Sequence, residues 1–332
     1  MSSIILKLLY NIVFVPFLYL ILLLLVPFNA KIRKGVLGRI GLAGQLRSFK
    51  RNVQGNPVAV FHCASMGEFE HTRPFIFELK KMVTDIKIVV LFFSPSGFEN
   101  IKSSSAVNLF AYSPHEFFFS VWNFIRIIRP SVWIIAKHDV WPNQVWFLQY
   151  FKVPLFLINA SLHRQSSRLV WFTRPFHREV YGCFSKILAI SVTDRNNFSL
   201  LVDPEKLTVV GDTKFDQVLY RKEESRKKKV IPEEIYEGCW PVIAGSTWPE
   251  DHHHIIPVFI ELHRKYPDMC FVICPHEPTE VHLTELELLL KNEGSIRLSN
   301  IDEYNHERFI LIDRIGVLAN IYAIGKVAYV GG

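Results

Sequence analysis

Short apolar runs alternate with amphipathic stretches along most of the chain, which is the pattern of strands and helices that follow one another. Helices are expected at 68–83, 116–128, 142–150, 250–266, 280–290 and 317–324. Strands are expected at 58–63, 87–93, 107–112, 132–136, 155–159, 186–191, 207–211, 241–245, 269–274, 309–312 and 327–330. This alternation predicts an α/β fold whose parallel sheets are covered on both faces by helices.

The alternation breaks once, in the polar segment 212–237, which contains the charged run 221–229. We interpret that run as a solvated linker or helix surface and not as a binding patch. The arrangement predicts two Rossmann-like, doubly wound domains facing a cleft, at 31–213 and 214–332, after an N-terminal segment 1–30. Because the chain stops directly after an apolar strand, without a covering helix, the second domain is expected to be partial.

The N-terminal segment is an expected membrane anchor. Residues 8–28 are 21 residues without a charge, close to the about 20 that cross a hydrocarbon core as a helix. Asn11, Pro16 and Pro27 interrupt the run, so a helix that lies in the interface stays open. Positive charge follows the run, and the positive-inside rule then predicts a single anchor with the remaining chain on the cytoplasmic side of the membrane.

The formal net charge of +7 is concentrated near this anchor, since residues 1–67 contain no Asp or Glu. A basic cluster beside an apolar segment favours an anionic membrane surface as partner. Nucleic acid is the rival explanation, and we set it aside because no nucleic-acid-binding motif is present. The five cysteines include no C-x-x-C pair, which fits a reduced compartment. The pattern does not fix an oligomeric state.

No metal or other cofactor is expected. The chain has neither a G-x-x-x-x-G-K-[ST] loop nor an H-E-x-x-H pair. His252, His253 and His254 are adjacent, so on a helix they point in different directions and cannot all bind one ion. We interpret them as an exposed helix start.

Glu68 is the first candidate for chemistry. It stands where the strand 58–63 gives way to a helix, and ligands collect at the carboxyl ends of strands in open α/β sheets. A carboxylate at this place can act as a base. The structural alternative is a helix cap that Glu68 completes with Ser65.

Several segments together resemble the 3-deoxy-D-manno-octulosonic acid (Kdo) transferases, which are membrane-anchored glycosyltransferases. The family's A-S-x-G-E, L-W-P-N, N-A-R-L-S and G-x-x-K-F-D elements are similar to 64–68, 140–143, 159–163 and 211–216. Its A-x-S-T, P-R-H-P, M-G-E-L and F-V-G-G elements are similar to 244–247, 275–278, 315–318 and 329–332. The common order of these elements across nearly the whole chain makes the resemblance specific.

The resemblance implies a GT-B fold and transfer of Kdo from CMP-Kdo to a lipid A precursor, with inversion at the sugar carbon. Glu68 would be the general base, because a sugar hydroxyl is too weak an acid to ionise before it attacks. Lys214 would stabilise charge in the transition state, with an ordinary linker lysine as the alternative. Asp139 would replace the family's second acid, although the register of 137–139 leaves a structural role equally open.

The resemblance also implies two groups of binding residues. Acceptor binding falls to Ser65, Gly67 and Asn159, of which the first two are also ordinary turn residues. Donor binding falls to Ser246, Thr247, Pro275, His276, Ile315, Gly316 and Val317, with a plain helix cap as the alternative for the first two. The family's arginine is replaced by His276 and its glutamate by Val317, so a side-chain ion pair to the donor is lost here while backbone contacts can persist.

Two other functions remain open. One is a GT-B transferase that uses a UDP-sugar on a lipid-linked acceptor. The other is a truncated, non-catalytic protein that binds lipid at the membrane, because the family pattern normally continues past V-G-G into a further nucleotide-binding segment. The number of Kdo residues transferred does not follow from the sequence.

Overall fold

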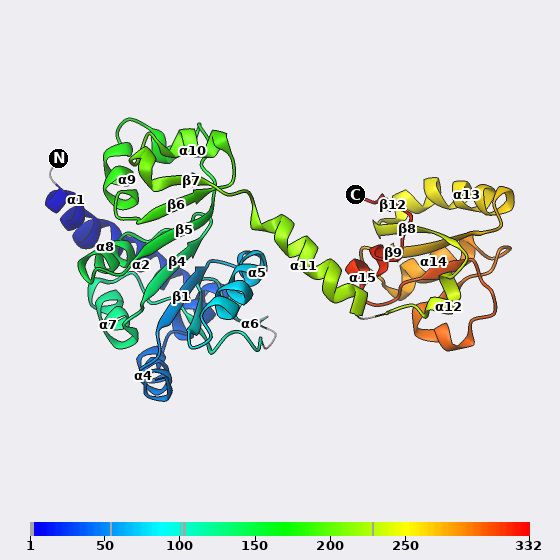
Figure 1. The fold of residues 1–332 in the computed structure, drawn as a ribbon, viewed down its shortest axis with the longest axis horizontal. Coiled ribbons are helices and arrows are strands. Elements are labelled where there is room, and N and C mark those ends of the chain that lie inside the picture. Colours follow the sequence, from blue (N-terminus) through cyan, green and yellow to red (C-terminus); the bar gives the residue numbers. More distant parts are fainter. Residues whose placement is uncertain (1–2, 54, 100, 102–103, 228) are drawn as a thin grey trace. The chain divides into compact units, whose positions relative to one another are not determined.

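The computed structural model describes residues 3–53, 55–99, 101, 104–227 and 229–332. The chain divides into two compact units, Met1–Gln217 and Val218–Gly332, each with its own sheet (Figure 1). The hydrophobic residues that the structure describes form separate cores in the two units.

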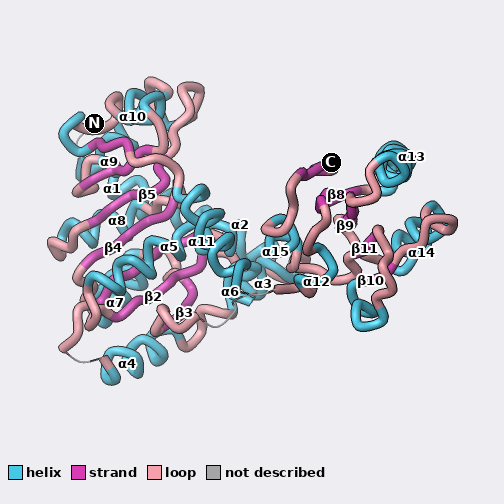
Figure 2. Tube along the Cα trace, turned by 45° about the vertical axis from the view of Figure 1, so that its right-hand side comes forward, coloured by secondary structure: helices cyan, strands magenta, loops and turns pink. Residues whose placement is uncertain are grey.

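The sheet of the first unit has the strand order β3-β2-β1-β4-β5-β6-β7, and every pair in it is parallel. Figure 2 shows several of these strands, in magenta, side by side. Its strands are β1 (Val58–Cys63), β2 (Lys87–Phe92), β3 (Leu109–Tyr112), β4 (Val132–Ala136), β5 (Leu155–Ala160), β6 (Lys186–Ala189) and β7 (Leu207–Val209). This confirms the parallel α/β arrangement expected for the first part of the chain.

Strand β1 shows why these segments are continuously apolar. Every residue of β1 is buried, and its side chains alternate between two cores. Val58 and Val60 belong to one core, whereas Ala59, Phe61 and Cys63 belong to the other. Successive side chains of a strand point to opposite faces, so a strand covered on both sides has no polar face to show in the sequence.

Helices cover both faces of this sheet. They are α1 (Ser3–Leu9), α2 (Val15–Leu25), α3 (Ala30–Leu37), α4 (Leu42–Asn52), α5 (Met66–Met82), α6 (Pro95–Glu99), α7 (Phe118–Ile128), α8 (Pro142–Tyr150), α9 (Arg174–Tyr181) and α10 (Val192–Phe198). The core around Val60 includes residues of α2, α4, α7, α8 and α9, and the opposite core includes residues of α5. A π-helical turn, Tyr10–Phe14, joins α1 to α2.

The sheet of the second unit has the order β10-β11-β9-β8-β12 and is also parallel throughout. Its strands are β8 (Trp240–Thr247), β9 (Met269–Pro275), β10 (Ile296–Arg297), β11 (Phe309–Leu311) and β12 (Val327–Val330). The helices are α11 (Thr213–Lys227), which begins in the first unit, and α12 (Glu233–Tyr236), α13 (Pro249–Lys265), α14 (Glu280–Leu289) and α15 (Leu318–Tyr322).

Each strand expected from the sequence is present, with ends that shift by up to two residues. The two-residue strand β10 was not expected. Much of the polar segment 212–237 forms the helix α11, which includes most of the charged run 221–229; residue 228 of that run lies outside the described residues.

Candidate functional site

The strand order of the first sheet places a switch point between β1 and β4. From β1 the chain continues to β2 on one side, whereas the next strand on the other side is β4. Ligands of open α/β sheets bind in the crevice at the carboxyl ends of two such strands. Glu68 follows β1 and Asp139 follows β4, so the topology brings both expected acids to one edge of the sheet.

Glu68 is fixed in place by the start of α5. Ser65 is the N-cap residue, and its hydroxyl accepts a hydrogen bond from the Glu68 N–H at 3.4 Å. The Glu68 carboxylate reaches back and accepts a hydrogen bond from the Ala64 N–H at 2.6 Å. This reciprocal pattern is a variant of the capping box. Glu68 is 7% exposed, so its carboxylate is held nearly dehydrated at the helix N-terminus.

The two acids have different electrostatic surroundings. Burial raises the pKa of Glu68, an effect that the Ala64 N–H opposes and the neighbouring Asp139 reinforces, and the net pKa lies above the usual range. Burial also pushes the pKa of Asp139 upward, but the hydrogen bond and charge of His62, together with smaller contributions from Trp141 and His138, outweigh it and leave the pKa below the ordinary value. Because the two pKa values are shifted in opposite directions, Asp139 stays ionised and Glu68 is suited to accept a proton.

His62 is a site residue that the sequence reasoning missed. It lies inside β1, is completely buried, and its Nε2 is 2.8 Å from Oδ2 of Asp139. Its Nδ1 is 3.4 Å from the Ser113 hydroxyl oxygen, which accepts a further hydrogen bond from the Gln144 amide at 3.0 Å. A buried imidazole needs polar partners, so a histidine within an apolar strand could have indicated a polar group nearby.

Asn159 holds the turn that carries Lys214. Asn159 lies one residue before the end of β5 and has a positive φ of 51°. Its side-chain amide donates to the Thr213 hydroxyl at 2.6 Å, and its side-chain oxygen accepts from the Thr213 N–H at 3.1 Å. The Thr213 hydroxyl in turn donates to the His71 carbonyl of α5 at 2.7 Å. Both ends of the Asn159 amide are therefore engaged within the protein. Lys214 is exposed beside this junction.

Two largely apolar cavities border this edge of the sheet. One, of about 340 Å³, is lined by Asp139 and Arg168 and extends to Tyr10 and Phe14 of the N-terminal helical segment. The other, of about 310 Å³, lies between α2, α3 and the loop after β2. Ser94 of that loop donates its N–H to the Ala64 carbonyl at 3.1 Å, directly before the Glu68 turn. Asp139 lines the first of these cavities, whereas Glu68 is not among the residues that line either one.

In the second unit, the expected donor residues also lie at strand ends. Ser246 and Thr247 end β8, and Pro275 ends the adjacent β9 with His276 directly after it. The His276 N–H donates to the Thr247 carbonyl at 2.9 Å, and its ring stacks on Trp248 with centroids 4.5 Å apart. Thr247 is buried.

The Thr247 hydroxyl is 2.8 Å from Nε2 of His252, so within this structure it is paired inside the protein. This contact also corrects the expectation of an exposed helix start at 252–254. His252 is completely buried, whereas His253 and His254 are exposed. The three rings point in different directions as expected, but the first of them turns into the core because α13 packs that side on the sheet.

Gly331 marks the switch point of the second sheet, between β8 and β12. A Cβ at this position would lie 2.5 Å from Oδ2 of Asp251 and 2.7 Å from the Ser246 carbonyl oxygen, so any larger residue requires a shift of the backbone. Tyr329 of β12 donates its hydroxyl to Asp251 at 2.6 Å. The end of β12 is thus closely packed against the turn that follows β8.

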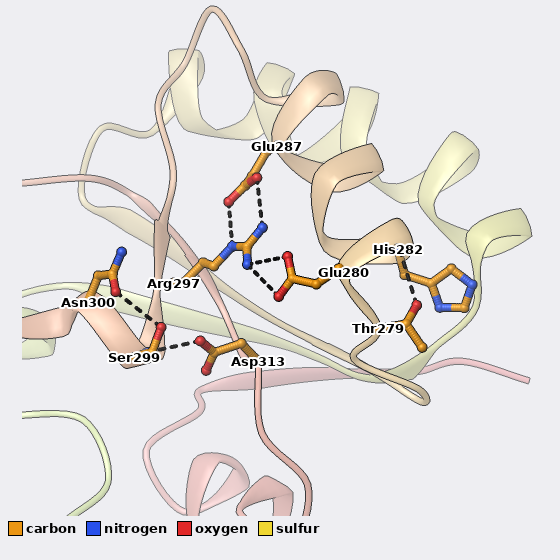
Figure 3. A network of polar contacts seen from close by, with 8 residues as sticks. All are labelled: Thr279, Glu280, His282, Glu287, Arg297, Ser299, Asn300 and Asp313. Carbon is orange, nitrogen blue, oxygen red and sulfur yellow. Dashed lines mark hydrogen bonds and ion pairs between the residues drawn. The ribbon is translucent and has the colours of Figure 1, made fainter.

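The remaining expected donor residues follow β11. Gly316 has a φ of 89°, Ile315 is exposed, and Val317 is partly buried before α15. Figure 3 shows how the preceding segment is anchored: Asp313 accepts a hydrogen bond from the Ser299 N–H at 3.2 Å.

Arg297 of β10 fixes the neighbouring helix α14 in the same network (Figure 3). It donates to Glu287 at 2.6 and 3.0 Å and to Glu280 at 3.0 and 2.9 Å. These hydrogen bonds and charges raise the pKa of Arg297. The guanidinium of Arg297 thus binds two glutamates on different turns of α14 and holds both turns against the sheet.

Comparison with known families identifies the first unit. Residues 36–217 match the family model of 3-deoxy-D-manno-octulosonic-acid transferase (kdotransferase). The chain is 27% identical to the 3-deoxy-D-manno-octulosonic acid transferase of Haemophilus influenzae, over 83% of this chain and 65% of the relative. It is 26% identical to the enzyme of that name from Aquifex aeolicus, over 82% and 68%. The chain thus spans about two thirds of the length of these curated relatives.

Solved structures support the fold. UDP-GlcNAc 2-epimerase from Neisseria meningitidis, bound to UDP-GlcNAc, superposes with a TM-score of 0.54 at 17% identity, over 82% of this chain and 76% of that one. The epimerase from Methanocaldococcus jannaschii gives a TM-score of 0.51 at 15% identity, over 82% and 77%. At these identities the likeness concerns the fold alone, and it confirms the GT-B fold class expected from the sequence.

Proposed function

Because this chain belongs to the 3-deoxy-D-manno-octulosonic acid (Kdo) transferase family, we propose that it transfers Kdo from CMP-Kdo to a lipid A precursor, lipid IVA, in lipopolysaccharide core biosynthesis. The observation that carries the proposal is the buried Glu68 carboxylate at the switch point of the first sheet, with Asp139 beside it. No metal or cofactor takes part in the proposed reaction.

In the proposed reaction, Glu68 removes the proton from an acceptor hydroxyl as that oxygen attacks the anomeric carbon of Kdo. The new carbon–oxygen bond forms as the bond from this carbon to the phosphate of CMP breaks, with inversion, and CMP leaves. The proton remains on Glu68. A carboxylate whose pKa is raised by burial suits this step because it binds a proton more readily than an exposed one.

Acceptor binding is assigned to the first unit. The N–H groups of the turn at Ser65 and Gly67 point from a helix N-terminus, where an anionic group of the acceptor is favoured. Asn159 contributes by holding the Lys214 turn against α5, and Lys214 supplies positive charge near the reacting groups. The apolar cavities beside the N-terminal helix suit the acyl part of a glycolipid.

Donor binding is assigned to the second unit, at the carboxyl ends of β8, β9 and β11. Because the Thr247 hydroxyl is paired with His252, we assign Thr247 a backbone contact and leave the hydroxyl contact to Ser246. Pro275, Ile315, Gly316 and Val317 also act through their backbone. His276 stands where the family has arginine, so the donor's negative charge receives weaker recognition at this position.

We further propose that the chain works at the inner membrane, with its catalytic part on the cytoplasmic side and anionic lipid as a partner. The helix Ile4–Leu25 has a mean hydropathy of 2.5 and is long and apolar enough to cross a membrane by length and composition.

The test is transfer from CMP-Kdo to lipid IVA by the full chain, with the product identified by mass. Replacing the base, Glu68→Gln, is expected to lower turnover by about 10²–10⁴-fold while the thermal midpoint of unfolding stays unchanged. Glu78→Gln on the exposed side of α5 is the matched control and should retain activity. Full activity of the Glu68 variant would remove Glu68 from the mechanism.

The same assay separates the alternatives. Product from a UDP-sugar but none from CMP-Kdo would replace the Kdo assignment by the UDP-sugar transferase. Binding of lipid IVA by the wild-type chain without turnover of either donor would favour the non-catalytic lipid-binding protein.

A further inference from the structure

The N-terminal helical segment is bound to the first unit by polar side chains. The Tyr10 hydroxyl donates to Oε1 of Glu116 at 3.2 Å, and the Tyr19 hydroxyl accepts from the Glu116 N–H at 2.8 Å. Asn11 and Asn143 exchange a pair of amide hydrogen bonds at 3.0 and 2.9 Å. Glu116 and Asn143 are buried, so these contacts satisfy groups that would otherwise lack partners.

The attachment extends over much of the segment. Lys7 pairs with Glu179 of α9 at 3.0 Å, and Val15, between the two tyrosines, is 1% exposed. Lys7, Asn11, Val15 and Tyr19 recur every four residues and therefore share one face. At about 1.5 Å per residue, the segment from Lys7 to Tyr19 covers roughly 18 Å of helix.

The opposite face of the same segment is apolar and exposed. Its exposed residues are Ile4, Ile5, Leu8, Leu9, Ile12, Val13, Phe14, Phe17, Leu20, Ile21, Leu23, Leu24 and Leu25. Tyr19 packs on Phe117 with ring centroids 4.3 Å apart, and the neighbouring Phe119 is 77% exposed. An exposed apolar surface of this extent marks an interaction site.

A second group of aromatic residues lies near Tyr10, toward the N-terminal end of the segment. Tyr10 packs on Phe176 with centroids 5.8 Å apart, and the chain just before Phe176 exposes Trp171 and Phe172. Aromatic side chains are enriched at the boundary between hydrocarbon and headgroups. After the helix, Lys31 and Arg33 are exposed on α3, and residues 1–67 carry no acid. The charge next to the apolar face therefore complements anionic headgroups.

We propose that the segment Ser3–Leu25 does not cross the membrane but lies in the interface of an anionic phospholipid bilayer, with its polar face kept on the first unit. A hydrocarbon core of about 30 Å requires about 20 helical residues, yet residues 7–19 are held by the protein. Crossing would withdraw Asn11 and both tyrosines and leave Glu116 and Asn143 buried without them. The inference does not depend on which sugar is transferred.

Protease accessibility tests this topology in the full chain. One protease site is placed before Met1 and a different one after Gly332, and each protease is added outside inverted and outside right-side-out membrane vesicles. A segment that lies in the interface puts both sites on the same side, so both are cut in the same vesicles. Cleavage of the two sites from opposite sides would overturn the proposal.

A second measurement tests the attachment itself. Asn11→Leu makes the segment more apolar but removes the amide pair with Asn143, whereas Ile12→Leu changes the exposed face. We expect Asn11→Leu to lower the thermal midpoint of the membrane-bound protein by about 2–4 °C, and Ile12→Leu to leave it unchanged. Equal midpoints for the two variants would show that the segment is not held by the domain and would contradict the proposal. Neither measurement reads sugar transfer, so failure of the proposed function would be seen separately.

Discussion

At the scale of single residues, His62 determines how the two acids of the site differ. Glu68 and Asp139 are both drawn from water, but only Asp139 has the His62 ring within hydrogen-bonding distance. The histidine therefore favours the ionised form of Asp139, whereas burial raises the pKa of Glu68. Its ring is buried behind them, and we regard it as a positioning residue.

Replacing His62 by leucine should destabilise the first unit. Asp139 and Ser113 would lose their partner, which costs about 1–3 kcal/mol, and thermal unfolding should shift down by several degrees. His62→Gln retains a hydrogen-bonding group and should recover part of the loss. Alanine at the exposed His138 is the control, and a His62→Leu midpoint equal to that of the control would contradict this role.

Site residues could be predicted from the sequence where their place at a strand end determines their role. They could not be predicted where their role depends on tertiary contacts. Glu68 and Asp139 follow strands whose ends could be predicted, so their meeting follows from topology. The places of His62 and His252 along the chain did not reveal their partners, because those partners are distant in the sequence or are set by the fold. Asn159 was expected from the family resemblance, but its pairing with Thr213, 54 residues away, could not be predicted from the sequence.

At the scale of elements, the first turn of α5 has a complete N-terminal cap and, beside it, an exposed glycine with free space around it. Glu68 and Ser65 complete the cap, whereas Gly67 is exposed, and a Cβ there would meet only the Ser65 hydroxyl, at 3.9 Å. The backbone of Gly67 is helical, so nothing in the fold requires glycine. Its open N-terminal position is instead the approach to the proposed acceptor site.

Gly67→Ala is therefore expected to separate stability from acceptor binding. The folded protein should keep or gain stability, by at most about 1 kcal/mol, because alanine is the better helix former. The added methyl group should raise KM for lipid IVA several-fold and leave KM for CMP-Kdo unchanged. Steady-state kinetics with each substrate varied in turn measures both, and an unchanged acceptor KM would argue against approach at this turn.

Element boundaries could be predicted where burial is continuous. Strands β1, β4 and β12 have the expected bounds, because apolar runs end there at polar or turn residues. Strand β10 has two residues and leaves no pattern long enough to recognise. The backbone of α11 is helical although its sequence is mostly polar, since its first turns are fixed to α5 through Thr213 and Gln217.

At the scale of the whole molecule, the two units have separate cores, and the family match falls within the first of them. The N-terminal segment, which composition alone assigns to a membrane, contributes Tyr10, Val15 and Tyr19 to the core of that unit. The sequence did not predict this, because Tyr10, Asn11 and Tyr19 are few among the surrounding leucines and isoleucines, and the face that they share gives only a weak pattern. Only partners such as Glu116 and Asn143 show which face the protein keeps.

The contact between Glu116 and the N-terminal segment also couples folding to proton uptake. Burial raises the pKa of Glu116 from 4.5 to about 8, although hydrogen bonds from Asn143 and Tyr10 oppose the rise. At neutral pH this carboxyl group is therefore protonated in the folded protein and ionised in the unfolded chain. Its stabilising contribution is complete below about pH 4.5 and is lost as the pH rises through about 8.

Glu116→Gln replaces the protonated acid by a neutral amide, so the variant should lack this dependence. Between pH 6 and pH 9 the thermal midpoint of the wild type should fall relative to that of the variant, and parallel curves would refute the coupling. Alkaline conditions are thus expected to loosen the hold of the first unit on its own N-terminal segment, with the proton as the ligand that is lost.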